Sequence, residues 1–173
     1  MGKIAFFEDK NFQGQSHECS TDCPDLRSCF GCCNSIRMES GCWVLYKHPN
    51  YTGNQYILSS GEYPDQQHHH LDSIKSCRSI KNVYGKSWKI PFYERPNFDG
   101  QSLELTEDMK SIQEKWLRRE VQSCKVLEGS WIFFEHPNFC GRQYLLEKGE
   151  YRHHSEWGAL KPTVGSIKII IEL

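Results

Sequence analysis

Nine cysteines and eight histidines are the residues of this chain that could support a metal or redox site. Two groups of cysteines have short spacings, Cys19-x3-Cys23 and Cys29-x2-Cys32-Cys33. These cysteines could supply half of a zinc site, because structural zinc is held by a closed set of four Cys or His ligands. The other half is missing nearby, since Cys42 stands alone. The spacing therefore favours cysteines that act as small buried hydrophobic residues.

Two runs of histidine, His68-His69-His70 and His153-His154, are the other possible metal site. Adjacent side chains rarely all face one ion, so a solvated surface loop is the favoured interpretation. We therefore expect neither a bound metal nor a cofactor.

An enzyme needs an activated nucleophile or a general acid–base pair, and no short motif in this chain identifies one. A reactive cysteine requires a lowered pKa and a partner base, which spacing alone does not indicate. The patterns G-x-S-x-G and H-E-x-x-H and the phosphate-binding loop do not occur. We expect a protein that is not an enzyme and has no catalytic residue.

The charge balance excludes several classes of partner. The 173 residues contain 21 bases and 22 acids, with no basic stripe, which argues against nucleic acid as a partner.

No apolar run is long enough to span a membrane, and no apolar leader follows Met1. We expect a cytoplasmic protein with reduced thiols and no terminal extension. A net charge of −1 favours self-association unless the charges are suitably patterned.

An eight-residue pattern of two aromatic residues and a glycine organises the chain. It reads aromatic, charged residue, three residues, aromatic, any residue, Gly. Glycine recurring at one place indicates a backbone with positive φ, and the leading ring can then cover a folded hairpin. The four copies occupy residues 7–14, 46–53, 93–100 and 134–141 and end at Gly14, Gly53, Gly100 and Gly141.

A second pattern follows each glycine by 21 to 25 residues: a serine, an apolar residue and a base. A serine hydroxyl is short enough to tie a bent backbone segment by a hydrogen bond. The repeat is therefore about forty residues long, and its repeated residues are interpreted as structural rather than chemical. The serines are Ser35, Ser76, Ser123 and Ser166.

These two patterns resemble the βγ-crystallin Greek-key motif, and the chain as a whole is similar to the vertebrate lens gamma-crystallins. Segments such as Gly141-Arg142-Gln143-Tyr144-Leu145-Leu146 are closest to the gamma-S branch. The resemblance implies that each glycine lies in a folded hairpin that the serine hydroxyl holds in place.

The tripeptide Gly-Glu-Tyr occurs only in the second and fourth repeats, so a two-repeat domain has been duplicated. The resemblance makes Tyr63 and Tyr151 tyrosine corners, in which the phenol bonds back to the backbone. We predict an all-β fold of two domains, each a sandwich of two four-stranded Greek keys. The expected domains are 1–81, with motifs 1–40 and 41–81, and 88–173, with motifs 88–128 and 129–173, joined by a linker at 82–87.

Local signals add three expectations. Gly41 should end the strand that begins at Ser35. Pro91 should place its strand at a sheet edge, because proline cannot donate to the ladder. The segment Ser111-Ile112-Gln113-Glu114 fits a capping box that opens one helical turn.

The resemblance also predicts an apolar patch on each domain through which the two domains pair. Core positions are an equally good interpretation of these residues from sequence alone. Burial of such a patch at ~25 cal/mol per Å² would stabilise the pairing by several kcal/mol. The patch residues are Val44, Ile57 and Ile80 in the first domain, and Ile132, Leu145 and Ile170 in the second.

Microbial members of this family bind calcium with two Asp or Asn residues placed shortly before the motif serine. Calcium requires such oxygen ligands. The windows before the four serines lack the acid pair, and only Asp72 remains, with Lys75 beside its serine. We expect no calcium binding tighter than millimolar.

The resemblance implies a structural constituent of the eye lens, a monomer in lens fibre cytoplasm that gives refractive power and transparency. Its partners would be itself and other crystallins, through weak contacts. The alternative is a calcium- or metal-binding βγ-crystallin module outside the lens.

Overall fold

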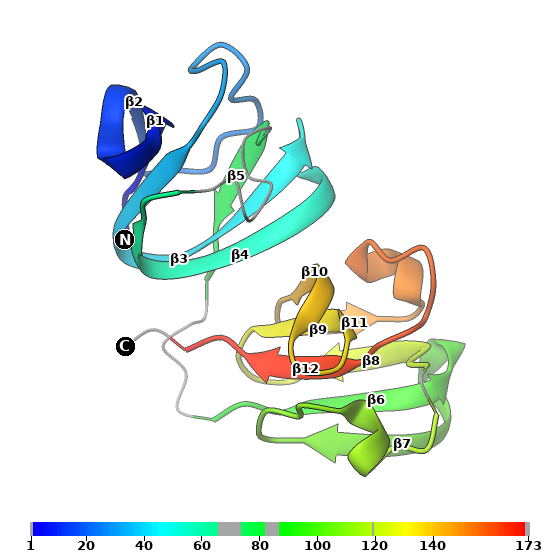
Figure 1. Cartoon of the computed structure of the whole chain (residues 1–173). Helices are drawn as coiled ribbons and strands as arrows, with labels where there is room; N and C mark the ends of the chain where they lie inside the picture. The colour runs from blue at the N-terminus through cyan, green and yellow to red at the C-terminus, as the bar shows by residue number, and fades with distance from the viewer. Residues whose placement is uncertain (1, 66–73, 82–86, 119, 172–173) are drawn as a thin grey trace. The chain divides into compact units, whose positions relative to one another are not determined.

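A computed structural model describes residues 2–65, 74–81, 87–118 and 120–171 of the chain. These residues form β-strands with short 3-10 turns, which confirms the all-β prediction. The chain divides into two compact units, residues 1–80 and 81–171 (Figure 1). The predicted linker lies almost wholly outside the described residues.

The first unit is built on β3 (Ser35–His48), a long strand that belongs to two sheets. Its first half pairs with β1, for example at Ile36 with Phe6, and β1 pairs in turn with β2. Its second half pairs with β5 on one side and with β4 on the other. The remaining strands are β1 (Ile4–Asp9), β2 (Gln13–Cys19), β4 (Thr52–Tyr63) and β5 (Ser76–Ser79).

The strand at Ser35 does not end at Gly41, contrary to the prediction. Gly41 has φ +87°, and β3 continues through it into the other sheet. In the second unit the equivalent Gly129, with φ +85°, does separate two strands. Glycine thus marks the crossing between sheets in both units, because the bend requires a positive φ.

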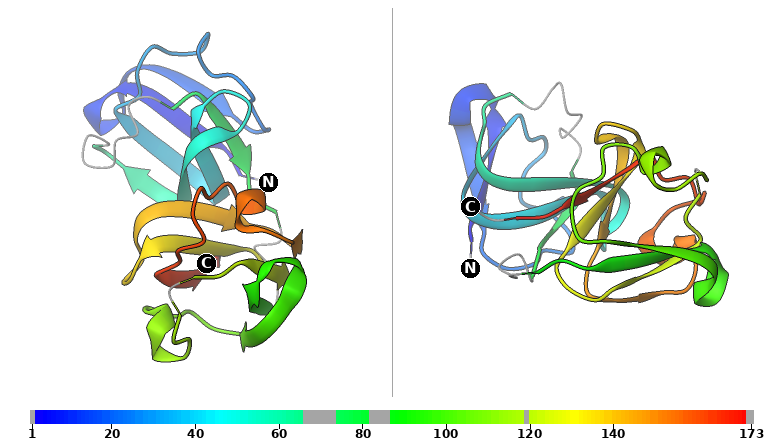
Figure 2. Two further views of the ribbon diagram at one scale, coloured as in Figure 1. Left: turned by 90° about the vertical axis from the view of Figure 1, so that its right-hand side faces the viewer. Right: turned by 90° about the horizontal axis from the view of Figure 1, so that it is seen from below.

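The second unit repeats this plan with separate strands. One sheet has the order β7-β6-β8-β11, and the other has the order β12-β9-β10. The green strands β6 and β7 and the yellow to orange strands β9 and β10 form different layers (Figure 2). The strands are β6 (Ile90–Arg95), β7 (Asp99–Leu105), β8 (Ser123–Val126), β9 (Trp131–His136), β10 (Cys140–Leu146), β11 (Gly149–Tyr151) and β12 (Ser166–Ile169).

Each unit exchanges a strand between its two repeats. Strand β11 belongs to the fourth repeat but pairs with β8 of the third, with Tyr151 opposite Cys124. In the first unit the end of β4 likewise pairs with the first half of β3, with Tyr63 opposite Ile36. The exchange makes each unit one sandwich rather than two independent Greek keys.

Each unit has its own apolar core between the layers. The core of the first contains the fully buried Phe6, Trp43 and Leu45. That of the second contains Phe92, Trp131 and further aromatic residues. The alternation of buried and exposed positions along the strands therefore supplies one face of every sheet to a core.

The prediction for Pro91 is wrong, because β6 lies between β7 and β8. The ladder to β8 includes Phe92 and Tyr93 and then a single bridge from Lys89 to Glu128. The proline is therefore accommodated by an interrupted ladder inside the sheet, not by an edge.

The helical turn predicted after Ser111 exists as η5 (Ile112–Glu114), but Ser111 makes no side-chain cap hydrogen bond. A capping box instead begins η6 (His154–Trp157), where the side chain of His153 accepts from the backbone of Ser155. Two further 3-10 turns in the described residues are η1 (Lys10–Phe12) and η4 (Pro96–Phe98).

Candidate functional site

The four hairpins share one backbone conformation. The motif glycines have φ of +80°, +85°, +81° and +87°, and the Asn and aromatic residues just before them are also left-handed. Two consecutive non-glycine residues at positive φ are strained, although Asn tolerates this region better than most. The recurring Asn is a sequence signal that the pattern analysis missed. The strained pairs are Asn11–Phe12, Asn50–Tyr51, Asn97–Phe98 and Asn138–Phe139.

The motif serine holds this strained pair in place. In the fourth repeat the Ser166 hydroxyl donates to the carbonyl of His136 at 2.7 Å and accepts from the N–H of Phe139 at 2.9 Å. All four serines are fully buried and make the same two bonds. The donor bonds run to Asp9, His48, Arg95 and His136, and the acceptor bonds come from Phe12, Tyr51, Phe98 and Phe139.

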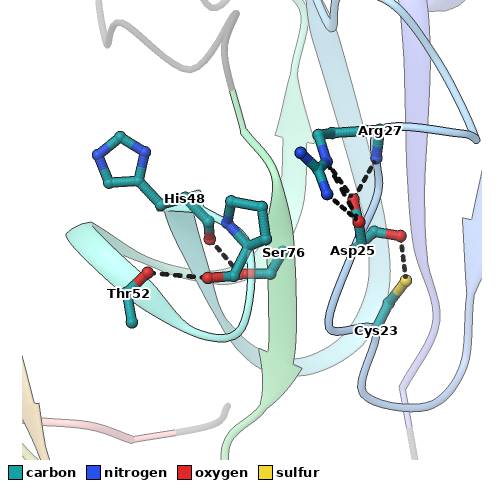
Figure 3. Close-up of polar contacts among 7 residues, drawn as sticks. Cys23, Asp25, Arg27, His48, Thr52 and Ser76 are labelled. Carbon is teal, nitrogen blue, oxygen red and sulfur yellow. Dashed lines mark hydrogen bonds and ion pairs between the residues drawn. The ribbon is translucent and has the colours of Figure 1, made fainter.

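The second repeat shows the arrangement at close range (Figure 3). The hydroxyl of Ser76 points to the carbonyl of His48, at 2.7 Å. The hydroxyl of Thr52 closes the same turn by donating to the carbonyl of Pro49 at 2.8 Å. The hairpin is therefore fixed by a bond within the turn and by a bond from the first residue of β5.

The two aromatic residues of each motif pack edge to face. Their ring centroids lie 5.6 to 5.7 Å apart in all four repeats, a favourable geometry for aromatic pairs. The leading ring thus covers the hairpin, as the pattern indicated.

The base after each serine has a role that the sequence analysis did not assign. Arg37 lies over the ring of Phe12 at 4.1 Å, and Lys125 lies over Phe98 at 4.4 Å. Lys168 lies over Phe139 in the same way, at 5.2 Å. Such cation–π contacts stabilise the exposed side of the second ring. The second repeat departs, because Arg78 donates instead to the phenol oxygen of Tyr46 at 3.3 Å.

Both tyrosine corners bond back to the chain four residues earlier. The hydroxyl of Tyr63 donates to the carbonyl of Ser59 at 2.7 Å. The hydroxyl of Tyr151 donates to the carbonyl of Glu147 at 3.1 Å and accepts from its N–H at 2.9 Å.

Each unit also has an apolar sheet face that its core does not use. Val44 pairs with Ile57, and Ile132 pairs with Leu145, at equivalent places in the two units. The core residues Trp43 and Leu45 flank Val44 in sequence and point to the opposite face of the strand. None of the six predicted patch residues belongs to either core, which leaves their pairing a prediction.

The pKa values of one carboxyl group and two thiols differ from their ordinary values. Side-chain hydrogen bonds from Arg27 lower the pKa of the Asp25 carboxyl to about 2, in a bidentate surface pair (Figure 3). Burial raises the pKa of the Cys33 thiol to about 12, and burial also raises that of Cys124. The thiols of Cys33 and Cys124 are therefore protonated at neutral pH.

Within the described ranges no group of three or more His, Cys, Asp or Glu residues could hold a metal ion. The run His68–His70 and Asp72 lie outside those ranges. His153 and His154 are engaged with the Ser155 hydroxyl and the Ala159 carbonyl. No helix in the described part of the chain is long and apolar enough to cross a membrane.

Comparison with known proteins agrees with the hairpin geometry. The model of the Beta/Gamma crystallin family matches residues 3–80 and 89–170. Gamma-crystallin S of Cyprinus carpio is 53% identical over 99% of this chain and 100% of its own length. Gamma-crystallin M2 of Chiloscyllium indicum is 51% identical over 99% and 98%, and gamma-crystallin A of Rattus norvegicus is 51% identical over 100% and 99%. With four equivalent pinned hairpins and full-length similarity of this degree, the chain belongs to the beta/gamma crystallin family.

Proposed function

We propose that this chain is a structural protein of the eye lens, which gives refractive power and transparency as a densely packed, long-lived solute. The observation that carries the proposal is the full-length identity of about half with several gamma-crystallins. The proposed work is collective, and no single residue performs it. We place the protein in the cytoplasm of lens fibre cells.

The composition suits this function. Aromatic residues make up 13% of the chain, and nine cysteines add polarisable sulfur, which raises the refractive increment per residue. The polar bonds that hold the hairpins are buried, because all four motif serines are fully inaccessible. A protein built in this way can remain folded for long periods without any bound group.

We further propose a monomer with weak contacts to itself and to other crystallins. The 21 bases and 22 acids nearly cancel, and the salt bridges join side chains that are mostly exposed. Mixed-sign surfaces of this kind avoid large single-sign fields.

Sedimentation velocity on the purified chain tests the monomer, and immunoblotting of soluble tissue extracts tests the lens assignment. We expect one species near 20.3 kDa and a major soluble band in lens. A scarce protein outside the lens, with a melting temperature that rises in millimolar calcium, would instead support the binding-module alternative.

A further inference from the structure

Strand β7 (Asp99–Leu105) lies at the edge of its sheet. Among the described strands it pairs with β6 alone (Figure 1). An edge strand has a row of main-chain N–H and C=O groups without a strand partner, and such a row can pair with another chain. The outer edge of β7 is therefore a place where a second molecule could add a strand.

Hydrogen bonds alternate along paired strands, so the register shows which β7 groups face outward. Tyr93 of β6 bonds toward β8, because its carbonyl accepts from the residue that precedes that strand. Its neighbour Phe92 therefore bonds toward β7, where Leu103 lies opposite. The next main-chain groups along β7 in each direction, those of Ser102 and Glu104, must then point away from β6. They are the groups that an added strand would bind.

A groove lies beside this edge. It has a volume of about 410 Å³ and is lined by residues 101–103 of β7 and by residues 115–118. Its apolar part includes Leu103, which packs against the core, and Leu117, which is 93% exposed. When a peptide adds a strand to a sheet edge, pockets of this kind receive its alternate side chains. The groove therefore offers an apolar contact next to the main-chain bonds.

The charges around the groove already have partners within the chain. Arg118 forms an ion pair with Glu94 at 2.7 Å, and Lys115 lies 3.8 Å from a glutamate carboxylate. Glu104, a charged residue of the edge itself, pairs with Lys89 at 3.5 Å. Natural sheet edges are often protected by charges that discourage another strand. Because the charges here are neutralised by partners, two copies of this edge can approach each other.

We propose that β7 pairs with β7 of a second copy in the antiparallel direction, as a weak contact that forms at high concentration. The inference rests on the proposed function, since it names one of the self-contacts of a densely packed protein. The register places Leu103 opposite Leu103 of the second copy, at a position where cross-strand side chains lie closest. Ser102 then faces Glu104 on both sides of the two-fold axis, and no glutamate lies opposite another.

The equivalent edge of the first unit lacks the apolar centre. Strand β2 pairs with β1 in the same register, with Phe6 opposite His17, just as Phe92 lies opposite Leu103 in the second unit. Pairing of two β2 strands would bring two histidine rings together instead of two leucines. We therefore assign the contact to β7, and β2 provides the matched control.

Amide hydrogen exchange of the full chain, measured by NMR at micromolar and at millimolar concentration, tests the contact. Reductant prevents disulfide dimers through the exposed Cys32 and Cys140. The amides of Ser102 and Glu104 should exchange rapidly in dilute solution and slow at least about twofold once half of the chains are paired. The amide of Leu103, which bonds to β6, is the internal reference. Equal rates at both concentrations for the two outward amides, or protection of β2 instead, would overturn the proposal.

Two variants separate this contact from others. Ser102→Pro removes an N–H that points away from β6, so it blocks strand addition and keeps the ladder inside the sheet. Leu103→His copies the residue that β2 has at this place and requires no proline to fit a strand. Ser16→Pro is the matched control on β2. Sedimentation equilibrium at millimolar concentration should show monomers for the first two variants and the parent's self-association for the control. Self-association that persists in both β7 variants would show that β7 is not the interface.

Failure of this contact and failure of the proposed function give different results. If exchange shows no protection of β7, the contact is wrong, but the lens assignment still depends on the immunoblot alone. A dimer at micromolar concentration with protected β7 amides would overturn the proposed monomer and support the contact. Protection that appears only when another lens protein is added would show that a different chain occupies the edge, and would refute the pairing of two copies.

Discussion

Replacement of Ser166 by alanine tests the physical role of the motif serine. The change deletes a bond donated to the carbonyl of His136 and one accepted from the N–H of Phe139. It adds no atom to a site that is fully buried. The loss of stability therefore measures the removal of the two bonds and the cost of the two groups left unpaired, not a steric clash.

The magnitude follows from the two orphaned groups. A net hydrogen bond contributes about 1 kcal/mol, and leaving a buried donor or acceptor unpaired costs about 1–3 kcal/mol. The left-handed Phe139 also loses the group that stabilises its strained backbone. We expect Ser166→Ala to lower the free energy of unfolding of the second unit by about 2–4 kcal/mol, which corresponds to about 10–20 °C in its melting temperature.

Guanidinium unfolding followed by tryptophan fluorescence is the appropriate assay, because four of the five tryptophans lie in the second unit. Ser130→Ala is the matched control, since Ser130 is equally buried but its hydroxyl makes one bond, to the carbonyl of Lys81 at 2.8 Å. We expect it to cost about 1 kcal/mol. If Ser166→Ala costs no more than the control, the serine does not hold the hairpin and this account is refuted.

Three further changes test other parts of the fold. Gly141→Val should destabilise the second unit by at least about 2 kcal/mol and lower its solubility, because φ is +87° and a Cβ would lie 2.6 Å from the ring of His136. Thermal melting measures the loss, and Gly31→Val is the control, because a Cβ at Gly31 would meet open space. Tyr151→Phe should cost about 1–3 kcal/mol in the same denaturation assay, since the phenol makes two backbone bonds that the ring alone cannot. The pKa of Cys33 is about 12 in the folded chain and about 9 in the unfolded chain. The resulting contribution to the free energy of unfolding is fully present below pH 9 and is lost as the pH rises from 9 to 12. Unfolding curves at these pH values should show a fall of up to about 4 kcal/mol that Cys33→Ala removes; an unchanged slope would contradict it.

The repeated pattern was enough to predict the hairpins, because glycine, aromatic ring and serine each have one local task. In the fourth repeat the ring pair, Gly141 and Ser166 lie within 32 residues of one another. In every copy the serine follows the glycine by 21 to 25 residues. The missed feature in the hairpin, the left-handed Asn, carried a visible signal in its fourfold recurrence.

Pairings between distant strands could not be predicted in the same way. Proline at position 91 suggested an edge, yet β6 is interior because the neighbouring ladder tolerates an interruption there. The pattern at Ser111 fits a capping box, but tertiary packing decides which side chain reaches the backbone, and His153 forms the box instead. Cys19 and Cys77 belong to one buried cluster although they lie 58 residues apart, and their spacing gave no sign of this.

The strand exchange determines how these local features act together. Tyr151 lies on β11 in the sheet of β8, whereas Ser166 begins β12 in the other sheet, although both belong to the fourth repeat. A defect at either place therefore weakens both layers of the sandwich, because the repeat contributes strands to each. The two repeats of a unit must then unfold together, and neither can be stable alone with one sheet missing a strand. Duplication of whole pairs of repeats, which the recurrence of Gly-Glu-Tyr indicates, is what such a coupled unit requires.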